Sequence, residues 1–404
     1  MIFIMAWRNI WRNKMRSIVI ILSVAIGLFA GVAVLALYKG MLHSRVRTVI
    51  DAEVAHLQIH DTTFKKDFEP VFVLQQADSI LKVLHSMPEV KAISARSITQ
   101  GMLATTTGSM GVQINGVQPQ QEYEVSQLKK KIIEGDGFHS GKKNEILIGK
   151  KLADKMKLKI GSKLVLTFTD SSAEMVSAAF RVASIYRSDN APLDERNVYV
   201  ARENLNELLG IGNGLHEIAV LLNRDEDLDR VQRKLQEEFP AYQVETWRQI
   251  SPETDLMINT VDVYSYIIMV IIMLALAFGI INTMLMAILE RTREIGMMTA
   301  LGMNRVRLFF LVLLETILLT VSGTPIGLGI AWLATNYFNK NGLDLSGMGK
   351  EMMSSFGYST LIYPEFPSDK IIGVMMIVTG TAIISCLFPA MKALRLQPVE
   401  ALRR

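Results

Sequence analysis

The stretch Asn282–Gly302, NTMLMAILERTREIGMMTALG, places a compact group of charges between two long apolar runs. The run Val263–Leu289 contains no charged residue, and the run Leu308–Tyr337 contains a single one, Glu315. Because about 20 apolar residues span the hydrocarbon core of a bilayer, both runs are predicted to be transmembrane helices. The charged group between them, residues 290–307, is therefore expected to form a short turn at one membrane face.

The charged group has the spacing of a short amphipathic helix. Glu290 and Arg293 are three residues apart, and opposite charges at this spacing are neighbours on a helix. Arg291 and Glu294 repeat the arrangement, and an apolar side begins at Ile295. Two interpretations follow: a rigid helix that receives a push from a partner, or a solvated loop whose charges only set the membrane topology.

The composition indicates a membrane protein. Hydrophobic residues make up 50% of the 404 residues, and the mean hydropathy is +0.27. The net charge of +4 includes no basic run of the kind that binds nucleic acid, so no nucleic-acid partner is expected. The single cysteine, Cys386, excludes an intrachain disulfide, so an exported domain would depend on its own apolar core.

The N-terminal residues 1–16, MIFIMAWRNIWRNKMR, are expected to form an amphipathic segment at the cytoplasmic face. Trp7 and Trp11 would share one helix face, and aromatic side chains beside basic ones favour the level of the lipid headgroups. The uncharged run 17–38 exceeds the apolar region of a signal peptide, which is about 7–15 residues. It is therefore predicted to be the first transmembrane helix.

Residues 39–262 contain no segment that can span a bilayer and are long enough for a folded domain. A helix–proline–strand pattern occupies 77–98 and returns at 228–247. Two such units flanking a strand-rich middle, about 132–200, predict a split α+β domain with an insert. Chance similarity of two short units is the alternative. Within the insert, strands are predicted at 145–149, 163–169, 179–186 and 197–200, with a hairpin tip at 170–177.

The histidines of this domain show no metal-ligand spacing apart from His56 and His60, and no metal site is expected. These two are four residues apart on a predicted strand, 55–60. We expect a solvated or edge pair rather than a zinc site, because zinc needs three or four converging ligands.

Two polar residues lie inside the predicted transmembrane segments, Asn282 and Glu315. An unpaired carboxylate in a membrane costs several kcal/mol, so Glu315 is expected to face other helices or the interface, as a hydrogen-bond acceptor or as a cargo contact. Residues 338–370 are predicted to form a loop on the far side of the membrane. The fourth transmembrane helix is predicted at 371–388, broken at Pro389, and is followed by a basic tail, 389–404.

The distribution of basic residues predicts the topology. Residues 1–16, 290–307 and 389–404 each contain four Lys or Arg residues. Because short cytoplasmic segments carry an excess of positive charge, both termini and the central turn are expected in the cytoplasm and the large domain outside.

Three motifs together resemble the FtsX/MacB-type ABC transporter permeases: AWRNIWRNKMRS, NTMLMAILERTREIGMMTALG and FPAMKALRLQPVEALR. LIGKKLADKMKLKIGSKL and VETWRQISPE extend the resemblance over essentially the whole chain, which is most similar to the LolC/LolE lipoprotein-releasing branch. The implied fold is an α-helical membrane protein with four transmembrane helices. A large α+β extracytoplasmic domain with Porter- and Sabre-like parts would lie between helices 1 and 2.

The resemblance also implies the functional residues and partners. In this family the central turn is a coupling helix that docks on an ABC ATPase subunit. That contact would fall on Glu290, Arg291, Arg293, Glu294, Ile295 and Gly296, with a second contact in the tail at Pro389, Pro398 and Leu402. The chain has no G-x-x-x-x-G-K-S/T motif, so ATP and magnesium are expected on a separate ATPase, with no cofactor and no enzymatic activity on this chain.

The implied function is a permease of the bacterial inner membrane that pairs with a second copy or a paralogue and moves lipoproteins or other amphiphilic cargo. The LolC-type chains carry a proline-containing hook in a Sabre hairpin, whereas the equivalent stretch here, 167–179, is short and lacks proline. This departure argues against direct capture of a chaperone. Alternatives are MacB-like efflux of drugs, peptides or toxins, and an FtsX-like signalling scaffold for a cell-wall hydrolase.

Overall fold

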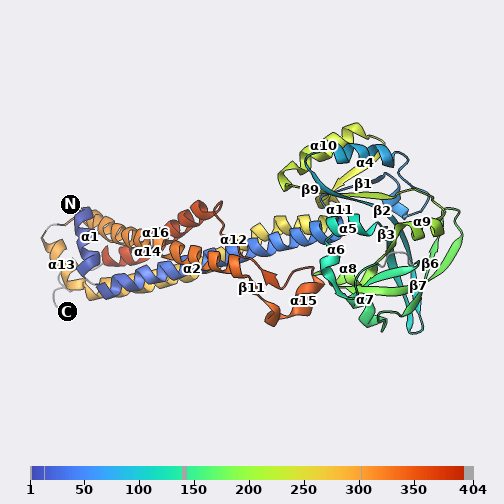
Figure 1. The fold of residues 1–404 in the computed structure, drawn as a ribbon. Helices are drawn as coiled ribbons and strands as arrows, with labels where there is room; N and C mark the ends of the chain where they lie inside the picture. The colour runs from blue at the N-terminus through green and yellow to red at the C-terminus, as the bar shows by residue number, and fades with distance from the viewer. Residues whose placement is uncertain (1, 13, 139–142, 302, 395–404) are drawn as a thin grey trace. The chain divides into compact units, whose positions relative to one another are not determined.

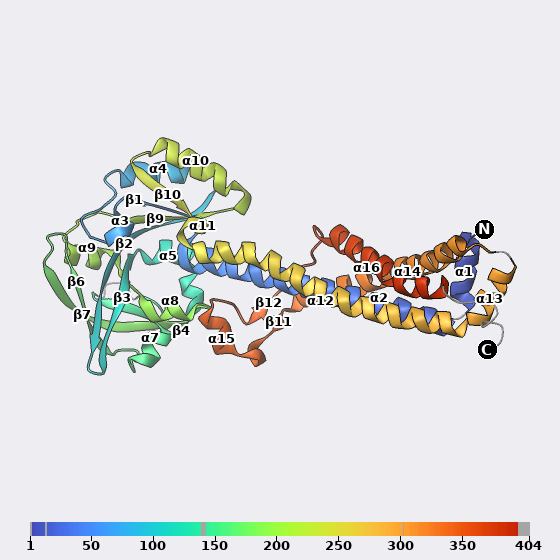
Figure 2. The same ribbon diagram turned by 180° about the vertical axis from the view of Figure 1, so that it is seen from behind.

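The chain forms two compact units in the computed structural model, which describes residues 2–12, 14–138, 143–301 and 303–394 (Figures 1 and 2). The helical unit comprises Met1–Leu42, Ile258–Leu343 and Leu361–Arg404. The sheet unit comprises His43–Met257 and Asp344–Thr360.

The helical unit is built from long apolar helices that bury one stripe each. Within the described residues, four helices are long and apolar enough to cross a membrane, and they coincide with the four apolar runs that the sequence shows. They pack through buried residues such as Leu28, Ile280, Leu319 and Val378. Its helices are α1 (Ile2–Arg12), α2 (Lys14–Thr48), α12 (Pro252–Glu290), α13 (Thr292–Ala300), α14 (Arg305–Asn341) and α16 (Ile371–Leu394); the ends of α2 and α12 extend into the sheet unit.

Two glycines of α14 allow it to approach α2 closely. A Cβ atom on Gly323 would lie 2.8 Å from the carbonyl oxygen of Ile21, and one on Gly327 would lie 2.7 Å from that of Ala25. Small residues are the usual means by which membrane helices bring their backbones together. The α2–α14 contact therefore depends on the absence of side chains at these two positions.

Two boundaries in the C-terminal part differ from those predicted. Helix α16 does not break at Pro389 but continues through it to Leu394. A proline removes one backbone hydrogen bond, and helices in apolar surroundings tolerate this where neighbouring groups satisfy the freed carbonyl. The predicted loop 338–370 is also partly ordered: it begins with the last turn of α14 and contains β11 (Leu343–Asp344), η3 (Ser346–Met348), α15 (Lys350–Ser355) and β12 (Leu361–Ile362).

The first part of the sheet unit is a four-stranded antiparallel sheet in the order β10 (Tyr242–Thr246), β1 (Leu57–Asp61), β9 (Glu217–Leu222), β2 (Val90–Thr105). Helices α4 (Ala77–Ser86) and α10 (Leu228–Glu238) lie next to each other over one face (Figure 1). The two repeated helix–strand patterns therefore end in one sheet, as the split-domain hypothesis expects. Strand β9, between them in the sheet, was not predicted from the sequence.

The second part is a closed ring of six strands. β2 leaves the first sheet after Arg96, and from Ser97 onward it pairs with β3 (Gly108–Val117). The ring continues through β8 (Asn197–Ala201), β5 (Glu145–Gly149), β7 (Met175–Tyr186) and β6 (Lys163–Thr169), which pairs with β2 again. Its interior holds Leu103, Ile114, Ile146, Leu166, Phe180 and Val198. This barrel includes β2 and β3, which precede the insert expected at 132–200.

Short elements connect and cover these sheets. The turn between β6 and β7 occupies 170–174, shorter than the tip expected at 170–177, because the side chain of Asp170 accepts hydrogen bonds from the backbone of Ser172 and Glu174. The remaining elements of the sheet unit are η1 (Val49–Val54), α3 (Phe64–Asp67), α5 (Pro119–Val125), α6 (Leu128–Lys131), β4 (Ile132–Glu134), α7 (Lys150–Lys155), α8 (Ala191–Arg196), α9 (Arg202–Leu209), η2 (Asp225–Asp227) and α11 (Trp247–Ile250).

Candidate coupling site

The central charged group spans a helix end, a turn and a second helix. Glu290 is the last residue of α12, Arg291 forms the turn, and α13 covers Thr292–Ala300. Both α13 and α1 lie at the same end of the helical unit in Figures 1 and 2. Gly302, the predicted helix stop, and the tail residues Pro398 and Leu402 lie outside the described residues.

Arg291 points into the helical unit rather than toward solvent, with 8% of its surface exposed. Its Nη1 donates to both carboxylate oxygens of Glu315, at 3.3 and 3.5 Å, and its Nη2 donates to the carbonyl oxygen of Asn9 at 3.2 Å. The turn before α13 is thus bonded to α14 through Glu315 and to α1 through Asn9. The family resemblance implied that Arg291 contacts the ATPase subunit. In the structure its side chain is bonded to α14 and α1 of the same chain.

Glu315 is buried on α14, with 5% of its surface exposed. A buried charge is stable only when it is paired and hydrogen-bonded, and Arg291 supplies both requirements. Of the two roles that the sequence left open, hydrogen-bond acceptor and cargo contact, this geometry favours the first.

A second ion pair joins α1 to α13. Arg12 donates to a carboxylate oxygen of Glu294, and both side chains are about half exposed. Exposed ion pairs contribute only about 0–1 kcal/mol, so this contact orients the two helices more than it stabilises them. On the same helix, Trp7 and Trp11 are exposed and pack edge to face with ring centroids 6.1 Å apart.

The remaining predicted contact residues divide by exposure. Glu290 and Arg293 are exposed, whereas Ile295 and Gly296 are buried against the bundle. An accessible surface therefore consists of Glu290 and Arg293, with Glu294, Met297 and Leu301 beside them. In the other predicted segments, Pro389 is buried within α16, and Asn282 is exposed on α12.

A cavity of about 380 Å³ adjoins the Arg291–Glu315 pair. Helices α1, α12, α13 and α14 all contribute to its wall, which is mostly apolar and rich in methionine. Among its lining residues are Met5, Met284, Met298, Leu308, Arg291 and Glu315. The inner face of α13 is therefore incompletely packed against its neighbours.

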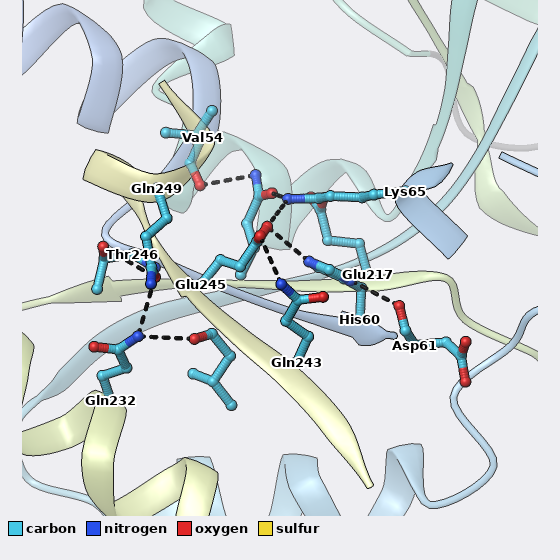
Figure 3. Close-up of polar contacts among 12 residues, drawn as sticks. Val54, His60, Asp61, Lys65, Glu217, Gln232, Gln243, Glu245, Thr246 and Gln249 are labelled. Atoms are coloured by element: carbon cyan, nitrogen blue, oxygen red, sulfur yellow. Dashed lines mark hydrogen bonds and ion pairs between the residues drawn. The ribbon is translucent and has the colours of Figure 1, made fainter. Parts of the chain in front are cut away.

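The sheet unit contains a polar cluster around Glu245 (Figure 3). His60 Nε2 lies 2.9 Å from Glu245 Oε2, and Lys65 Nζ donates to the same oxygen at 2.6 Å. The hydrogen bond with His60, followed by that from Lys65, lowers the pKa of Glu245 to about 2, although partial burial opposes this shift. Glu245 is therefore ionised at neutral pH, and its hydrogen bonds hold the side chains of His60 and Lys65 in place.

The prediction of a solvated or edge histidine pair is wrong. His56 and His60 have 2% and 1% of their surfaces exposed, and β1 is a central strand between β10 and β9. His56 is bonded to Asp225 at 2.9 Å, as His60 is to Glu245. Among the described residues, no group of three or more His, Cys, Asp and Glu side chains could hold a metal ion.

A buried ion cluster lies where β2 passes from the sheet into the barrel. Arg96 donates to both oxygens of Glu122 at 2.8 Å and to Glu217 at 3.0 Å. Burial raises the pKa of Glu122, but the charge and hydrogen bonds of Arg96 outweigh it and hold that pKa below its usual range. The sequence gave no signal for this cluster, because its members come from three distant segments.

Two family models match the chain. The FtsX-like permease C-terminal family matches residues 266–398, and the MacB-like periplasmic core domain family matches residues 17–238. The first match includes α13 and α14, and the second includes α2, much of the four-stranded sheet and the barrel.

Several known proteins, some of the same length as the chain and some longer, are similar to it in sequence. An uncharacterized ABC transporter permease of Methanocaldococcus jannaschii is 22% identical over 98% of this chain and 96% of its own length. The lipoprotein-releasing system transmembrane protein LolE of Haemophilus influenzae is 23% identical over 99% of this chain and 98% of its own length. The macrolide export ATP-binding/permease protein MacB of Campylobacter jejuni is 24% identical over 100% of this chain, which spans 61% of that protein. Because the core-domain family alone covers more than half of the residues, the chain belongs to the FtsX/MacB-type ABC transporter permeases.

Proposed function

We propose that this chain is the permease subunit of an ABC transporter and that α13 receives the movement of a separate ATPase, which binds ATP and magnesium. The observation that carries the proposal is the two-sided arrangement at residues 290–294. Glu290 and Arg293 face outward, where a partner could bind them, while Arg291 faces inward and is bonded to α14 and α1. A push on α13 would therefore reach two other helices through direct bonds.

The proposed membrane arrangement is that of the bacterial inner membrane. The termini and α13 would lie in the cytoplasm and the sheet unit outside, where the four-stranded sheet and the barrel would correspond to Porter- and Sabre-like parts. Ile271, Leu274 and Phe278 of α12 are 61%, 64% and 79% exposed, and the polar Asn282 is exposed on the same helix. Large exposed apolar side chains need lipid or a protein neighbour, and in the proposed arrangement the bilayer or a second permease chain would cover them.

The proposed cargo is a lipoprotein or another amphiphile taken from the membrane. MacB-like efflux of drugs, peptides or toxins is the second candidate, favoured by the 24% identity with MacB over the whole chain. An FtsX-like signalling scaffold for a cell-wall hydrolase is a third. Proteoliposomes that contain the permease and its ATPase distinguish these functions. Release of a triacylated lipoprotein supports the first, macrolide transport the second, and neither activity supports the scaffold.

The coupling role is tested by replacing Glu290 and Arg293 together with alanine. A matched control replaces Glu124 and Lys129, two exposed residues of the sheet unit that carry the same pair of charges. Truncating charges buried in an interface costs about 2–5 kcal/mol. The first variant should therefore lose co-purification with the ATPase, or cargo-stimulated ATP hydrolysis, while the control behaves as wild type. Normal assembly and stimulation in the Glu290/Arg293 variant would show that these charges serve only membrane topology.

A further inference from the structure

The four-stranded sheet has one apolar face and one polar face, and both are buried. Leu57 and Ile59 alternate along β1 with Gln58 and His60, and all four are at most 4% exposed. On the neighbouring strands, Glu245 of β10 lies directly opposite Gln58, and Glu217 of β9 lies directly opposite His60. Because side chains alternate along a strand, these polar residues share the face opposite to the one that Leu57 and Ile59 occupy.

A cavity of about 420 Å³ adjoins this polar face. It is bounded by the sheet, by strands β3 and β8 of the barrel, and by the short elements η1, α3 and α11. Its lining is mostly polar and includes Lys65, Arg96, Asn115, Tyr199, Glu217 and Glu245. This composition differs from that of an ordinary packing defect, which is apolar.

Two buried residues that line this cavity, Glu217 and Tyr199, each have a polar atom without a hydrogen-bond partner in the described part of the chain. Glu217 Oε1 accepts a hydrogen bond from Arg96 at 3.0 Å, but its Oε2 accepts none. The hydroxyl of Tyr199 is likewise unbonded, although its ring packs against Tyr186 with centroids 5.5 Å apart. Both residues have at most 6% of their surfaces exposed. Neither atom is one of the fully enclosed unbonded atoms of the described residues, so both belong to residues that line open space, where a bound group could reach them.

The charge at the cavity favours a cation. Three carboxylates line it, from Glu53, Glu217 and Glu245, against two cationic side chains, Lys65 and Arg96. The ion pairs that extend beyond the lining add one charge of each sign, Arg45 on Glu53 and Glu122 on Arg96. His60, on Glu245, adds a positive charge only when it is protonated, so the excess of one carboxylate remains while His60 is neutral. An anionic ligand would be repelled, and a donor-rich cation would complete the pairing.

We propose that this cavity binds a small polar molecule that carries a primary ammonium group. The ammonium, with three donors and no acceptor, would bond the open oxygen of Glu217 and the hydroxyl oxygen of Tyr199. Hydroxyl or amide groups of the same molecule would bond Asn115 and its neighbours. The site is remote in sequence from α13 and does not depend on the proposed coupling role.

Three monosaccharides of similar size test the proposal by their charge: glucosamine, glucose and glucuronate. Calorimetric titration uses the full chain in lipid nanodiscs at neutral pH, where most of the glucosamine carries a protonated amine. We expect saturable binding of glucosamine, binding of glucose at least about tenfold weaker, and no binding of glucuronate. Absence of any binding, or equal binding of all three sugars, would overturn the proposal.

Two adjacent tyrosines provide a matched pair of variants. Tyr199→Phe removes the unbonded hydroxyl and should weaken glucosamine binding about tenfold, the usual effect of losing a hydrogen bond to a charged group. Tyr186→Phe removes a hydroxyl that lies outside the cavity lining and donates to the carbonyl oxygen of Asn197 at 2.9 Å. It should lower thermal stability but leave the Kd unchanged. A wild-type Kd in Tyr199→Phe, or equal weakening in both variants, would contradict the assignment.

Discussion

Arg291 and Glu315 form a buried ion pair that links the turn between α12 and α13 to α14, with Nη1 at 3.3 Å from Oε1. Their side chains are 10% and 6% exposed, so each charge has little access to solvent and depends on the other. The Nε atom of Arg291 lacks a hydrogen bond among the described residues and lies 3.9 Å from Glu294. The pair is therefore constrained by its surroundings and sensitive to loss of either member.

Substitutions at Glu315 should show this dependence. Glu315→Leu leaves the buried Arg291 without its nearest carboxylate, and breaking a buried ion pair typically costs about 3–5 kcal/mol, whereas Glu315→Gln keeps an acceptor and should cost less. The double variant Arg291→Met, Glu315→Leu should recover most of the loss because no charge is left buried. Thermal unfolding of the purified chain in detergent measures all three. If Glu315→Leu and the double variant are equally unstable, the pair is not the source of the loss.

Replacement of Gly327 and of Gly329, both on α14, by alanine should have different effects on stability. Gly327→Ala places a Cβ atom 2.7 Å from a backbone oxygen of α2, and overpacking of this kind costs about 1–3 kcal/mol. Gly329→Ala is the control, because no atom lies within 4 Å of its Cβ position. We expect a lower Tm for Gly327→Ala and an unchanged or higher Tm for Gly329→Ala. Similar Tm values for the two variants would contradict the close α2–α14 contact.

The hydrogen bonds of Glu245 predict a dependence of stability on pH. Its folded pKa of about 2 lies below the unfolded value, so its contribution is complete above about pH 4.3 and is lost as the pH falls toward 2. Glu245→Gln removes this contribution and should reduce the decrease in Tm between about pH 5 and about pH 3. Glu226→Gln, at an exposed residue, is the control and should retain the wild-type slope. A wild-type slope in Glu245→Gln would argue against the pairing with His60 and Lys65.

The proposed topology predicts which cysteines are reached from outside the cell membrane. Cys386 is buried and is replaced by alanine to give a cysteine-free background. Ser172→Cys in the sheet unit should react with a membrane-impermeant thiol reagent in spheroplasts. Arg293→Cys should react only after permeabilisation, and the exposure of Arg293 makes it a better probe than buried Gly296. Labelling of position 293 in intact spheroplasts would reverse the orientation.

The elements with strong local patterns could be predicted from the sequence. The strands at 145–149 and 163–169 were predicted with their observed bounds, and the helices that begin at Ala77 and Leu228 with their observed starts. In each case the periodicity of apolar residues and a nearby turn or proline define the element without reference to distant segments. The four apolar helices are predictable for the same reason, since their length alone fits a bilayer.

Features that depend on strand order or on the direction of a turn could not be predicted. His56 and His60 were wrongly predicted to be solvated or at a sheet edge. Strand β1 becomes a central strand only because β9 and β10, which are far away in sequence, pair with its two sides. Arg291 and Arg293 have equivalent charges and neighbours in the sequence, yet one is buried and the other exposed. The difference arises from the path of the chain after Glu290, which spacing does not encode.

The passage of β2 through both the four-stranded sheet and the barrel has a mechanical consequence. Residues 90–96 pair with β9 and residues 97–105 pair with β3 and β6, so one extended backbone belongs to both parts. We expect a rotation of the barrel against the sheet to twist this strand at Arg96 and Ser97, because its backbone is hydrogen-bonded on both sides of that point. A strand shared in this way would act as a torsion spring, which we expect to return the two parts to one resting angle once a load is removed.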